Sequence, residues 1–406
     1  MAYRSRITEP LIRSRSGGLI AALAFSTIAT GLLQISLPLE LRQLRASPGE
    51  IGLTLAMFGF GMFAFEWLWG VVADHIGYRA PLIASQLLYA VAIVVLSRVQ
   101  TVPSIAASYF FACGMMVAVG PIARSYLGTA LHARLRATGL ALLASQWVIA
   151  EALGAGVGGP LIDYFPIRSV MLGSAVLPAV SGLLMFSVFR NYEPVHDRQV
   201  DAVDRDSAGA KRDVRRVLAV TATLALLIQV GLGGELALLP LLVTSRLGLS
   251  AGAAGAAMLI VGLVGGLLLV PGGSASDRWG RRPTMIAGGV ICAAGYVAYA
   301  LGSNFSLVIV GAVVRAVGAS LIWPAATAWI AESMPRPRHA FYMGLFGEFE
   351  NIGVTAGPII GGFVWSVAGI QAAFYAYAAA ALLAAAVAAL TVAGRSRETV
   401  PASVMP

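Results

Sequence analysis

The fold is decided by the stretch GGSASDRWGRR at residues 272–282, because GVVADHIGYR at residues 70–79 repeats its pattern. Both copies place Gly, Asp, Gly and Arg at the same intervals, and each joins one long apolar segment to the next. A duplicated connection between apolar segments predicts a membrane protein built from two related halves. The function is therefore expected where the two halves meet.

The composition also indicates a membrane protein. Of the 406 residues, 58% are hydrophobic and only 12% are charged, which leaves too little polar surface for a soluble chain of this length. The formal net charge of +9 does not indicate nucleic-acid binding, because the basic residues sit in short connections between apolar runs. The two cysteines, Cys113 and Cys292, fall inside apolar runs. No His/Cys spacing suggests a metal site, and no cofactor is expected.

Twelve apolar runs are each long enough to cross about 30 Å of hydrocarbon as a helix. The prediction is an all-α integral membrane protein with 12 transmembrane helices in two pseudo-symmetric six-helix bundles. The expected spans are 17–38, 50–72, 80–97, 102–124, 137–160, 167–189, 217–242, 251–272, 281–301, 305–329, 341–366 and 369–393.

The placement of charge predicts orientation and halves. Most basic residues fall in alternate connections, which predicts cytoplasmic termini under the positive-inside rule. Between the sixth and seventh spans lies the one long polar stretch, residues 190–216, rich in Asp and Arg. It is expected to be a cytoplasmic linker between an N-terminal bundle, residues 1–189, and a C-terminal bundle, residues 217–406.

The repeated Gly and Asp spacing, the six-plus-six layout and the central linker resemble the major facilitator superfamily of transporters. The second copy matches the family's loop pattern in full, whereas the first has His75 and Ala80 where basic residues are common. The resemblance implies a charged latch that favours one of two access states. The expected latch residues are Gly70, Asp74, Gly77, Arg79, Gly273, Asp277, Arg278, Gly280, Arg281 and Arg282.

Two glycine-rich segments lie in the fifth and eleventh spans, GAGVGGP at 154–160 and GVTAGPIIGG at 353–362. Glycines four residues apart give a flat face for close helix packing, and proline kinks the helix. The first segment resembles a motif of the 12-span drug:proton antiporters, although Asp163 stands where a further Gly is usual; packing common to many membrane proteins is the alternative. The expected packing residues are Gly154, Gly158, Pro160, Gly353, Gly357 and Pro358.

Charged side chains inside the spans are the next functional candidates, because burying a charge in a bilayer is costly. Removal from water favours the protonated form of a carboxyl group, so each of these glutamates is a candidate proton carrier. They are Glu66, Glu348, Glu350, Glu151 and Glu235. The candidates for the substrate cavity are Arg315, Asn351, Gln34 and Trp323.

Helical geometry separates the two glutamates of the eleventh span. Glu348 shares a polar face with Asn351, whereas Glu350 shares the packing face of Gly353. In the family the second helix meets the eleventh across the boundary between halves. We therefore expect Glu66 and one of these glutamates to form a protonation-sensitive contact between the halves.

Structural roles are the alternative for the other charges. Glu235 is expected in water near the outer mouth, and Glu151 is expected to hydrogen-bond within its own helix. Arg315 needs a partner across the cavity, either a glutamate or an anionic substrate. The family often has an arginine in the fourth helix, and Arg124, at the cytoplasmic end of that span, is not expected to replace it.

No G-x-x-x-x-G-K-[ST] phosphate loop and no Ser/His/Asp arrangement occurs, so neither ATP hydrolysis nor an enzyme is expected. The prediction is a monomeric secondary transporter of the plasma (bacterial inner) membrane that exports a small amphipathic compound or drug in exchange for protons. Its partners are then the lipid bilayer, the substrate and protons. Two alternatives stay open: a proton-coupled importer of a small nutrient, and a membrane interaction protein that transports nothing.

Overall fold

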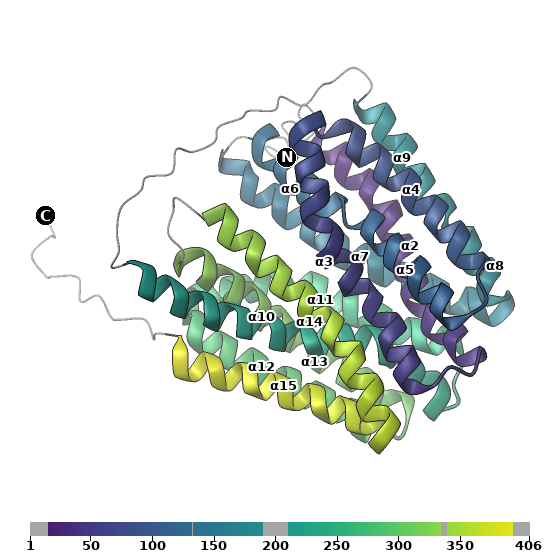
Figure 1. Cartoon of the computed structure of the whole chain (residues 1–406). Coiled ribbons are helices and arrows are strands. Elements are labelled where there is room, and N and C mark those ends of the chain that lie inside the picture. Colours follow the sequence, from purple (N-terminus) through teal and green to yellow (C-terminus); the bar gives the residue numbers. More distant parts are fainter. Residues whose placement is uncertain (1–14, 132, 190–209, 334–338, 393–406) are drawn as a thin grey trace, which may run out of the picture.

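The computed structural model describes residues 15–131, 133–189, 210–333 and 339–392 (Figure 1). Within these ranges 12 helical segments are long and apolar enough to cross a membrane, as predicted. The helices are α2 (Ser16–Gln43), α3 (Pro48–Ile76), α4 (Arg79–Arg98), α5 (Val102–Met116), α6 (Val119–Ala130), α7 (Ala133–Tyr164), α8 (Ile167–Ser174), α9 (Val176–Phe189), α10 (Ala210–Leu241), η1 (Leu242–Arg246), α11 (Ala251–Trp279), α12 (Arg281–Leu301), α13 (Phe305–Ser333), α14 (His339–Ala368) and α15 (Ile370–Thr391).

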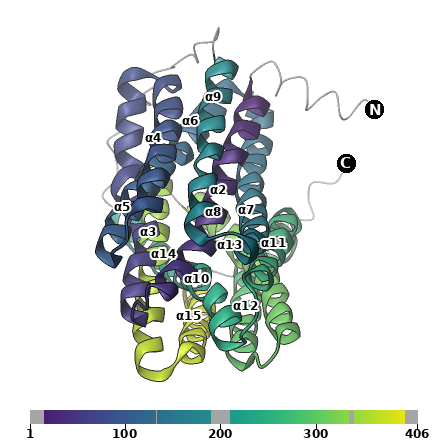
Figure 2. The same cartoon turned by 90° about the vertical axis from the view of Figure 1, so that its right-hand side faces the viewer.

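The helices form two bundles, α2–α9 and α10–α15, whose members run roughly parallel to one another (Figures 1 and 2). The bundles meet along two helix pairs, α3 with α14 and α7 with α11. We name these contacts the α3–α14 seam and the α7–α11 seam. Most of the predicted linker lies outside the described residues, so the boundaries at 190 and 216 stay predictions.

Prolines break two of the predicted spans. The fourth span consists of α5 and α6, because Pro121 has no N–H to donate to the carbonyl of Val117. That carbonyl instead accepts from the backbone N–H of Gly120 at 2.9 Å. The sixth span is broken between α8 and α9 in the same way, since Pro178 cannot donate to Ser174. Each span therefore consists of two helices.

The repeated pattern lies mostly on helices. Helix α3 continues past its predicted end at 72 and α11 past its predicted end at 272, so Asp74 and Asp277 lie in the last helical turns. Each helix ends at a glycine in the left-handed region, Gly77 with φ +82° and Gly280 with φ +95°. Side chains with a Cβ rarely adopt this conformation, which explains why glycine recurs there.

The duplication extends along the whole of α3 and α11, further than the sequence pattern showed. Gly52 and Gly255 occupy equivalent positions, and each lies at one seam. A Cβ at Gly52 would be 2.3 Å from the carbonyl oxygen of Pro358, and one at Gly255 would be 2.6 Å from that of Ala155. Both crossings therefore require glycine, because any side chain would separate the halves.

The seams are closed at one end of the molecule and apart at the other. We call the end where α2 begins and α15 ends the terminal side, and the opposite end the distal side. The crossings at Gly52 and Gly255 lie toward the distal side, whereas a Cβ at Gly70, Gly344 or Gly347 would meet nothing within 4 Å. Figure 1 shows the ribbons of the two bundles spreading toward the terminal side. This conformation is closed on the distal side.

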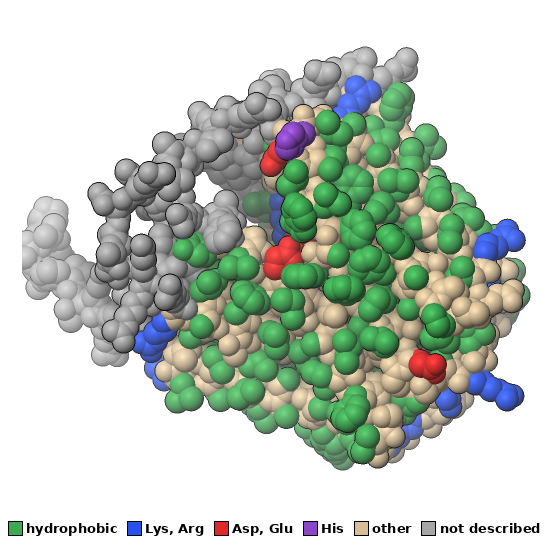
Figure 3. Space-filling model, in the orientation of Figure 1, with side chains coloured by type: hydrophobic (Ala, Val, Ile, Leu, Met, Phe, Trp, Pro, Cys, Tyr) green, Lys and Arg blue, Asp and Glu red, His purple; other side chains and the backbone are tan. Residues whose placement is uncertain are grey.

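The outer surface is suited to lipid. Large hydrophobic side chains are exposed on several helices, including Leu267 on α11, Phe363 on α14 and Leu390 on α15. Figure 3 shows one face covered mainly by hydrophobic side chains, with most Lys and Arg at its margins. An apolar belt of this extent is not stable in water and is expected where a protein contacts hydrocarbon.

Candidate functional site

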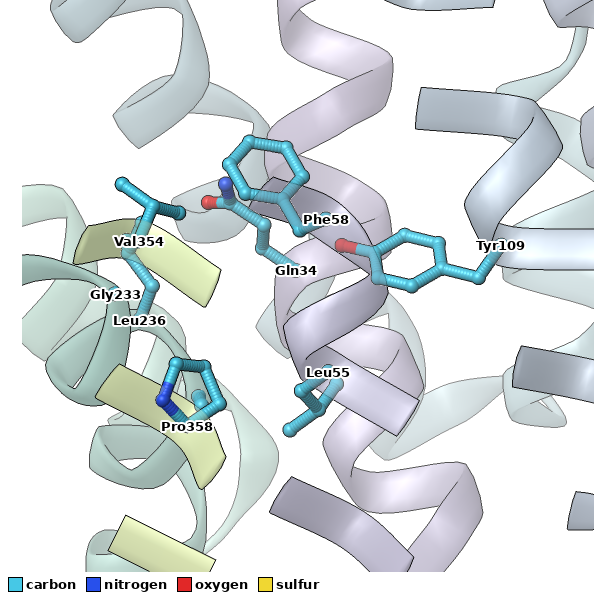
Figure 4. A pocket seen from close by; sticks show the side chains of 9 residues that line it. Gln34, Leu55, Phe58, Tyr109, Gly233, Leu236, Val354 and Pro358 are labelled. Atoms are coloured by element: carbon cyan, nitrogen blue, oxygen red, sulfur yellow. The ribbon is translucent and has the colours of Figure 1, made fainter. Parts of the chain in front are cut away.

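A pocket lies between the bundles, where the closed distal region meets the open terminal side. It is narrow, because the roughly 300 Å³ of space around it includes open solvent. Figure 4 shows Gln34, Phe58 and Tyr109 of the first bundle facing Val354, Leu236 and Pro358 of the second. The lining residues are Gln34, Leu55, Phe58, Tyr109, Gly233, Leu236, Ala237, Val354 and Pro358. None carries a charge, and their polar side-chain groups are one amide and one phenol.

Gln34 connects this pocket to a carboxylate. Its side chain is buried, and its Nε2 donates to Oε1 of Glu151 on α7, whereas Oε1 of Gln34 has no partner among the described residues. An unpartnered buried acceptor is costly, so a ligand that donates a hydrogen bond there would be stabilised. The predicted cavity role of Gln34 fits this position. Glu151 is therefore bonded to a different helix, α2, and it also has a hydrogen bond with Trp147 of its own helix, α7, so the bond expected within that helix is one of two.

Glu66 joins the two bundles. Its Oε1 accepts from Nη2 of Arg124 on α6 at 2.5 Å, and its Oε2 accepts from Nδ2 of Asn351 on α14 at 2.9 Å. One oxygen is therefore held by each half, just before α3 and α14 diverge toward Gly70. Gly120 leaves room for this ion pair, since a Cβ there would be 3.2 Å from Nη2 of Arg124. Arg124, which was not expected to replace the arginine of the family's fourth helix, thus takes part in this contact.

The two glutamates of α14 face different surroundings, as the helical geometry predicted. Glu348 lies beside Asn351 within the field of the Glu66 carboxylate, and its Oε2 is buried without a partner among the described residues. Glu350 points into the second bundle, where its Oε1 accepts from Nε1 of Trp323 at 2.6 Å and Nε2 of Gln229 at 2.9 Å. Glu348 is the α14 glutamate that faces Glu66. Trp323, expected in the cavity, orients Glu350 instead.

Arg315 and Glu235 form a buried ion pair inside the second bundle. Glu235 is only 1% exposed and Arg315 only 5% exposed. Nη2 of Arg315 contacts Oε2 of Glu235, whose Oε1 accepts from the hydroxyl of Tyr299 at 2.7 Å. The expectation of a solvated Glu235 near the outer mouth is wrong, because α10 turns this residue toward α12 and α13. Of the two partners expected for Arg315, the structure shows the glutamate, so Arg315 is not available to the cavity.

The latch residues do not bridge the halves in this conformation. No described residue forms an ion pair with Asp74, and the guanidinium of Arg79 lies over the ring of Phe186, 5.6 Å from its centroid. In the second copy Arg281 bonds Asp277 at 2.7 Å and Glu332 at 2.5 Å, all within one bundle. This second network is the more complete one, as the sequence comparison of the two copies suggested.

The remaining latch residues have local roles. Arg282 donates to the carbonyl of Ala389 at 2.5 Å on α15. Gly70 and Gly273 do not pack closely against another helix; the close approach of α11 to α13 falls on Gly272, whose added Cβ would be 1.9 Å from the carbonyl oxygen of Ser320. Arg278 lies in the last turn of α11.

The glycine-rich segments pack closely, as predicted, and do so within each bundle. Gly154 lies against the backbone of Ile28, and Gly158 against Leu32, both on α2. Gly353 and Gly357 lie against α10 in the same way. Pro160 lies within α7 and Pro358 within α14, where Pro358 also borders the pocket. Gly156 and Gly159 of α7 lie against α11 of the other bundle, and the four-residue spacing singled out neither of them.

Comparison with known proteins agrees with this architecture. The sequence profile described as Major Facilitator Superfamily matches residues 19–268 and again residues 221–404. The chain belongs to the major facilitator superfamily. As a major facilitator transporter it is a multi-pass membrane protein with a small-molecule substrate.

Relatives of this major facilitator transporter include proteins of known and unknown role. It is 29% identical over 147 residues to the quinolone resistance protein NorA of Staphylococcus aureus. This alignment covers 35% of this chain and 36% of NorA. It is 23% identical over 228 residues to the uncharacterized MFS-type transporter YttB of Bacillus subtilis, which covers 54% and 55% of the two chains. The alignments thus span about a third to a half of these relatives.

Solved structures share the fold at low identity. A bacterial homolog of the human lysosomal transporter Spinster, in an inward-facing and unoccupied conformation, superposes with a TM-score of 0.77 at 12% identity and covers 93% of this chain and 96% of the other. A D-xylose-proton symporter superposes with a TM-score of 0.76 at 16% identity and covers 93% and 98%. These similarities establish the two-bundle architecture with 12 transmembrane helices.

Proposed function

We propose that this protein is a proton-coupled exporter of a small amphipathic compound, working by alternating access in a bacterial plasma membrane with both termini in the cytoplasm. The observation that carries the proposal is the position of Glu66, whose two oxygens are held by opposite halves beside a second carboxyl group, Glu348. Protonation at this point changes the contact between halves, which is what coupling a proton to alternating access requires.

The charges around Glu66 support proton binding. Glu66 is paired with the guanidinium of Arg124, and the carboxyl group of Glu348 lies in the field of Glu66 at the boundary between bundles. With both carboxyls ionised, one negative charge lacks a partner in a partly desolvated place, whereas one bound proton balances the cluster. The cluster is therefore expected to bind and release a single proton as the seam changes.

The pocket supports an amphipathic substrate. Its walls are aliphatic and aromatic, and its polar side-chain groups are the amide of Gln34 and the phenol of Tyr109. A polyhydroxylated nutrient would leave most of its hydroxyl groups without partners there, at a cost for each. Import of a sugar-like nutrient is therefore the weaker proposal, although the fold is shared with a D-xylose-proton symporter.

The direction of transport is supported by similarity to NorA and by the glycine-rich segment of α7. Quinolone resistance, the role that NorA's name states, is consistent with export of an amphipathic compound. The basic residues gather on the terminal side, which supports placing that side in the cytoplasm. The structure then has its pocket open to the cytoplasm, the side from which an exporter collects its substrate. The interior carboxyls and the pocket argue against a protein that transports nothing.

The proposal is tested by Glu66→Gln in proteoliposomes, with ethidium and a fluoroquinolone as probes. One pH unit corresponds to about 1.4 kcal/mol, so electroneutral exchange of one proton for one monovalent cation such as ethidium supports about tenfold accumulation in that gradient. Glu66→Gln is expected to abolish accumulation, so that the substrate concentrations on the two sides of the membrane become equal. Counterflow exchange of substrate without a gradient is expected to continue. Glu50→Gln is the matched control, because Glu50 lies in the exposed first turn of the same helix and caps it with Ser47.

Two results would contradict the proposal. Full accumulation by both Glu66→Gln and Glu348→Gln would exclude the carboxyl pair as the proton site. Accumulation of substrate on the side into which the protons flow would identify a symporter, and therefore an importer.

A change in the pocket separates binding from coupling. Gln34→Leu removes the unpartnered acceptor and the bond to Glu151 while keeping a similar volume. The apparent affinity for a probe that donates a hydrogen bond to Gln34 is expected to fall about tenfold, the equivalent of one hydrogen bond of about 1.5 kcal/mol. Binding is measured by fluorescence titration of ethidium in detergent, where no gradient exists. An unchanged affinity for every probe would place the substrate elsewhere.

A further inference from the structure

A carboxylate of the first bundle caps a helix of the second. Asp163 lies in the last turn of α7, and its two oxygens accept hydrogen bonds from the backbone N–H groups of Ala251 at 2.9 Å and Gly252 at 2.8 Å. These residues begin α11, where N–H groups have no partner within their own helix. A negative charge at a helix N-terminus is also stabilised by the helix dipole. The contact therefore links the bundles at the distal end of the α7–α11 seam.

The shapes of both helices fit this contact. Gly159, one turn before Asp163, lies so close to α11 that a Cβ would be 2.4 Å from the carbonyl oxygen of Ala251. A Cβ at Gly252 would be 2.7 Å from Oδ2 of Asp163. The side chain of Ser250, the residue that precedes α11, reaches only the N–H of Ala253 at 3.2 Å. Two of the first N–H groups of α11 thus have their hydrogen-bond acceptors in the other bundle.

In the described part of the α3–α14 seam no carboxylate caps a helix of the other bundle, although the helices are repeats of one another. Helix α3 begins with Pro48, which has no N–H, and is capped from within by Ser47 and Glu50. Ser366 lies one turn after Gly362 on α14, as Asp163 lies one turn after Gly159 on α7. Its hydroxyl donates to the carbonyl of Phe363 at 2.6 Å, within its own helix. The cross-bundle cap is therefore confined to one seam.

We propose that Asp163 is a positioning residue that holds the distal side closed by capping α11 across the boundary between the bundles. Opening the distal side separates α7 from α11 and breaks both hydrogen bonds at once. The closed state gains two charge-assisted hydrogen bonds that the open state exchanges for water. The role concerns the balance between the two access states, and it goes beyond the proposed function because it depends on neither the substrate nor the coupling ion.

The test measures the distance across the distal side by pulsed electron paramagnetic resonance. Spin labels are placed at Gln100 and Ser303, exposed residues at equivalent distal positions of the two bundles. Cys113 and Cys292 are both buried, and they are replaced by alanine in every sample. The full-length protein is reconstituted in lipid nanodiscs without substrate. Asp163→Ala is expected to lower the ratio of distally closed to distally open molecules about tenfold.

The controls separate the effect of the Asp163 cap from a general loss of structure. Ser366→Ala changes the matching position of the other seam and is expected to leave the distance distribution unchanged. Asp163→Asn keeps the shape and one acceptor, and is expected to give an intermediate ratio if the protein stays folded. A second pair at Ile76 and Trp279, exposed on the terminal side, should shorten as the distal pair lengthens.

Superposition of the Asp163→Ala and wild-type distance distributions would overturn the proposal. Equal shifts in Asp163→Ala and Ser366→Ala would also overturn it, because the effect would then not be specific to this seam. Neither result depends on whether Glu66 couples protons, since no gradient and no substrate is present. Failure of the proposed role of Asp163 and failure of the proposed transport function are thus distinguishable.

Discussion

Arg315→Met is expected to destabilise the folded protein by about 3–5 kcal/mol, the largest effect on stability expected of a single side chain here. The substitution leaves the carboxylate of Glu235, which is 1% exposed, without its counter-ion in the second bundle. Among the described residues, only Tyr299 would still donate to it, through its hydroxyl. The measurement is reversible unfolding in mixed micelles, followed by the fluorescence of the tryptophans.

The double variant Glu235→Leu with Arg315→Met tests the physical cause. It removes both charges together, so most of the lost stability is expected to return, because well-packed apolar residues often replace a buried ion pair without penalty. Glu332→Gln is the matched control, since it breaks an ion pair to Arg281 in which the glutamate is exposed; a change below about 1 kcal/mol is expected. A double variant as unstable as Arg315→Met would show that packing, and not the unpaired charge, dominates.

Gly52→Val is expected to have the largest effect on transport among changes outside the proton and substrate sites. A Cβ at Gly52 would lie 2.3 Å from the carbonyl oxygen of Pro358, so the α3–α14 seam must widen by roughly 1 Å on the distal side. Overpacking of this kind costs about 1–3 kcal/mol, which lowers the population of the distally closed state about 5- to 150-fold. Export of the ethidium probe is expected to fall by a similar factor.

Gly49→Val is the control for this change. Gly49 lies one turn earlier in α3, and a Cβ there would meet nothing within 4 Å, so transport is expected to continue. The labels at Gln100 and Ser303 measure whether Gly52→Val keeps the distal side open. Normal transport by Gly52→Val would show that this seam tolerates a side chain, and that the glycine crossing does not control closure.

The sequence predicted the fold well because membrane-spanning helices are specified by local properties. The length of each apolar run, the repeated Gly and Asp spacing and the placement of basic residues are all visible without knowledge of tertiary contacts. The breaks in the fourth and sixth spans were missed, although Pro121 and Pro178 were in view. A proline within a membrane helix can cause either a kink or a break, and packing by neighbouring helices decides which.

The site was predicted only in part, because the roles of its charges depend on contacts between distant segments. Helical periodicity correctly separated Glu348 from Glu350, since faces of one helix follow from spacing alone. Periodicity could not show that Arg124 reaches Glu66 or that Glu235 faces Arg315. One signal was available: an interior arginine without an acid on its own helix requires a partner on another. Asp163 was noticed as a departure from a motif, but its partners on α11 could not be inferred.

The break between α5 and α6 gives the fourth span two separate attachments. Tyr109, on α5, lines the pocket, whereas Arg124, on α6, holds Glu66 and also donates from Nε to the carbonyl of Gly120 at 3.0 Å. In a continuous helix these two side chains would move together. The break between α5 and α6 lets α6 change its orientation relative to α5, so the guanidinium of Arg124 can follow Glu66 and Glu348 while the phenol of Tyr109 stays in the wall of the pocket.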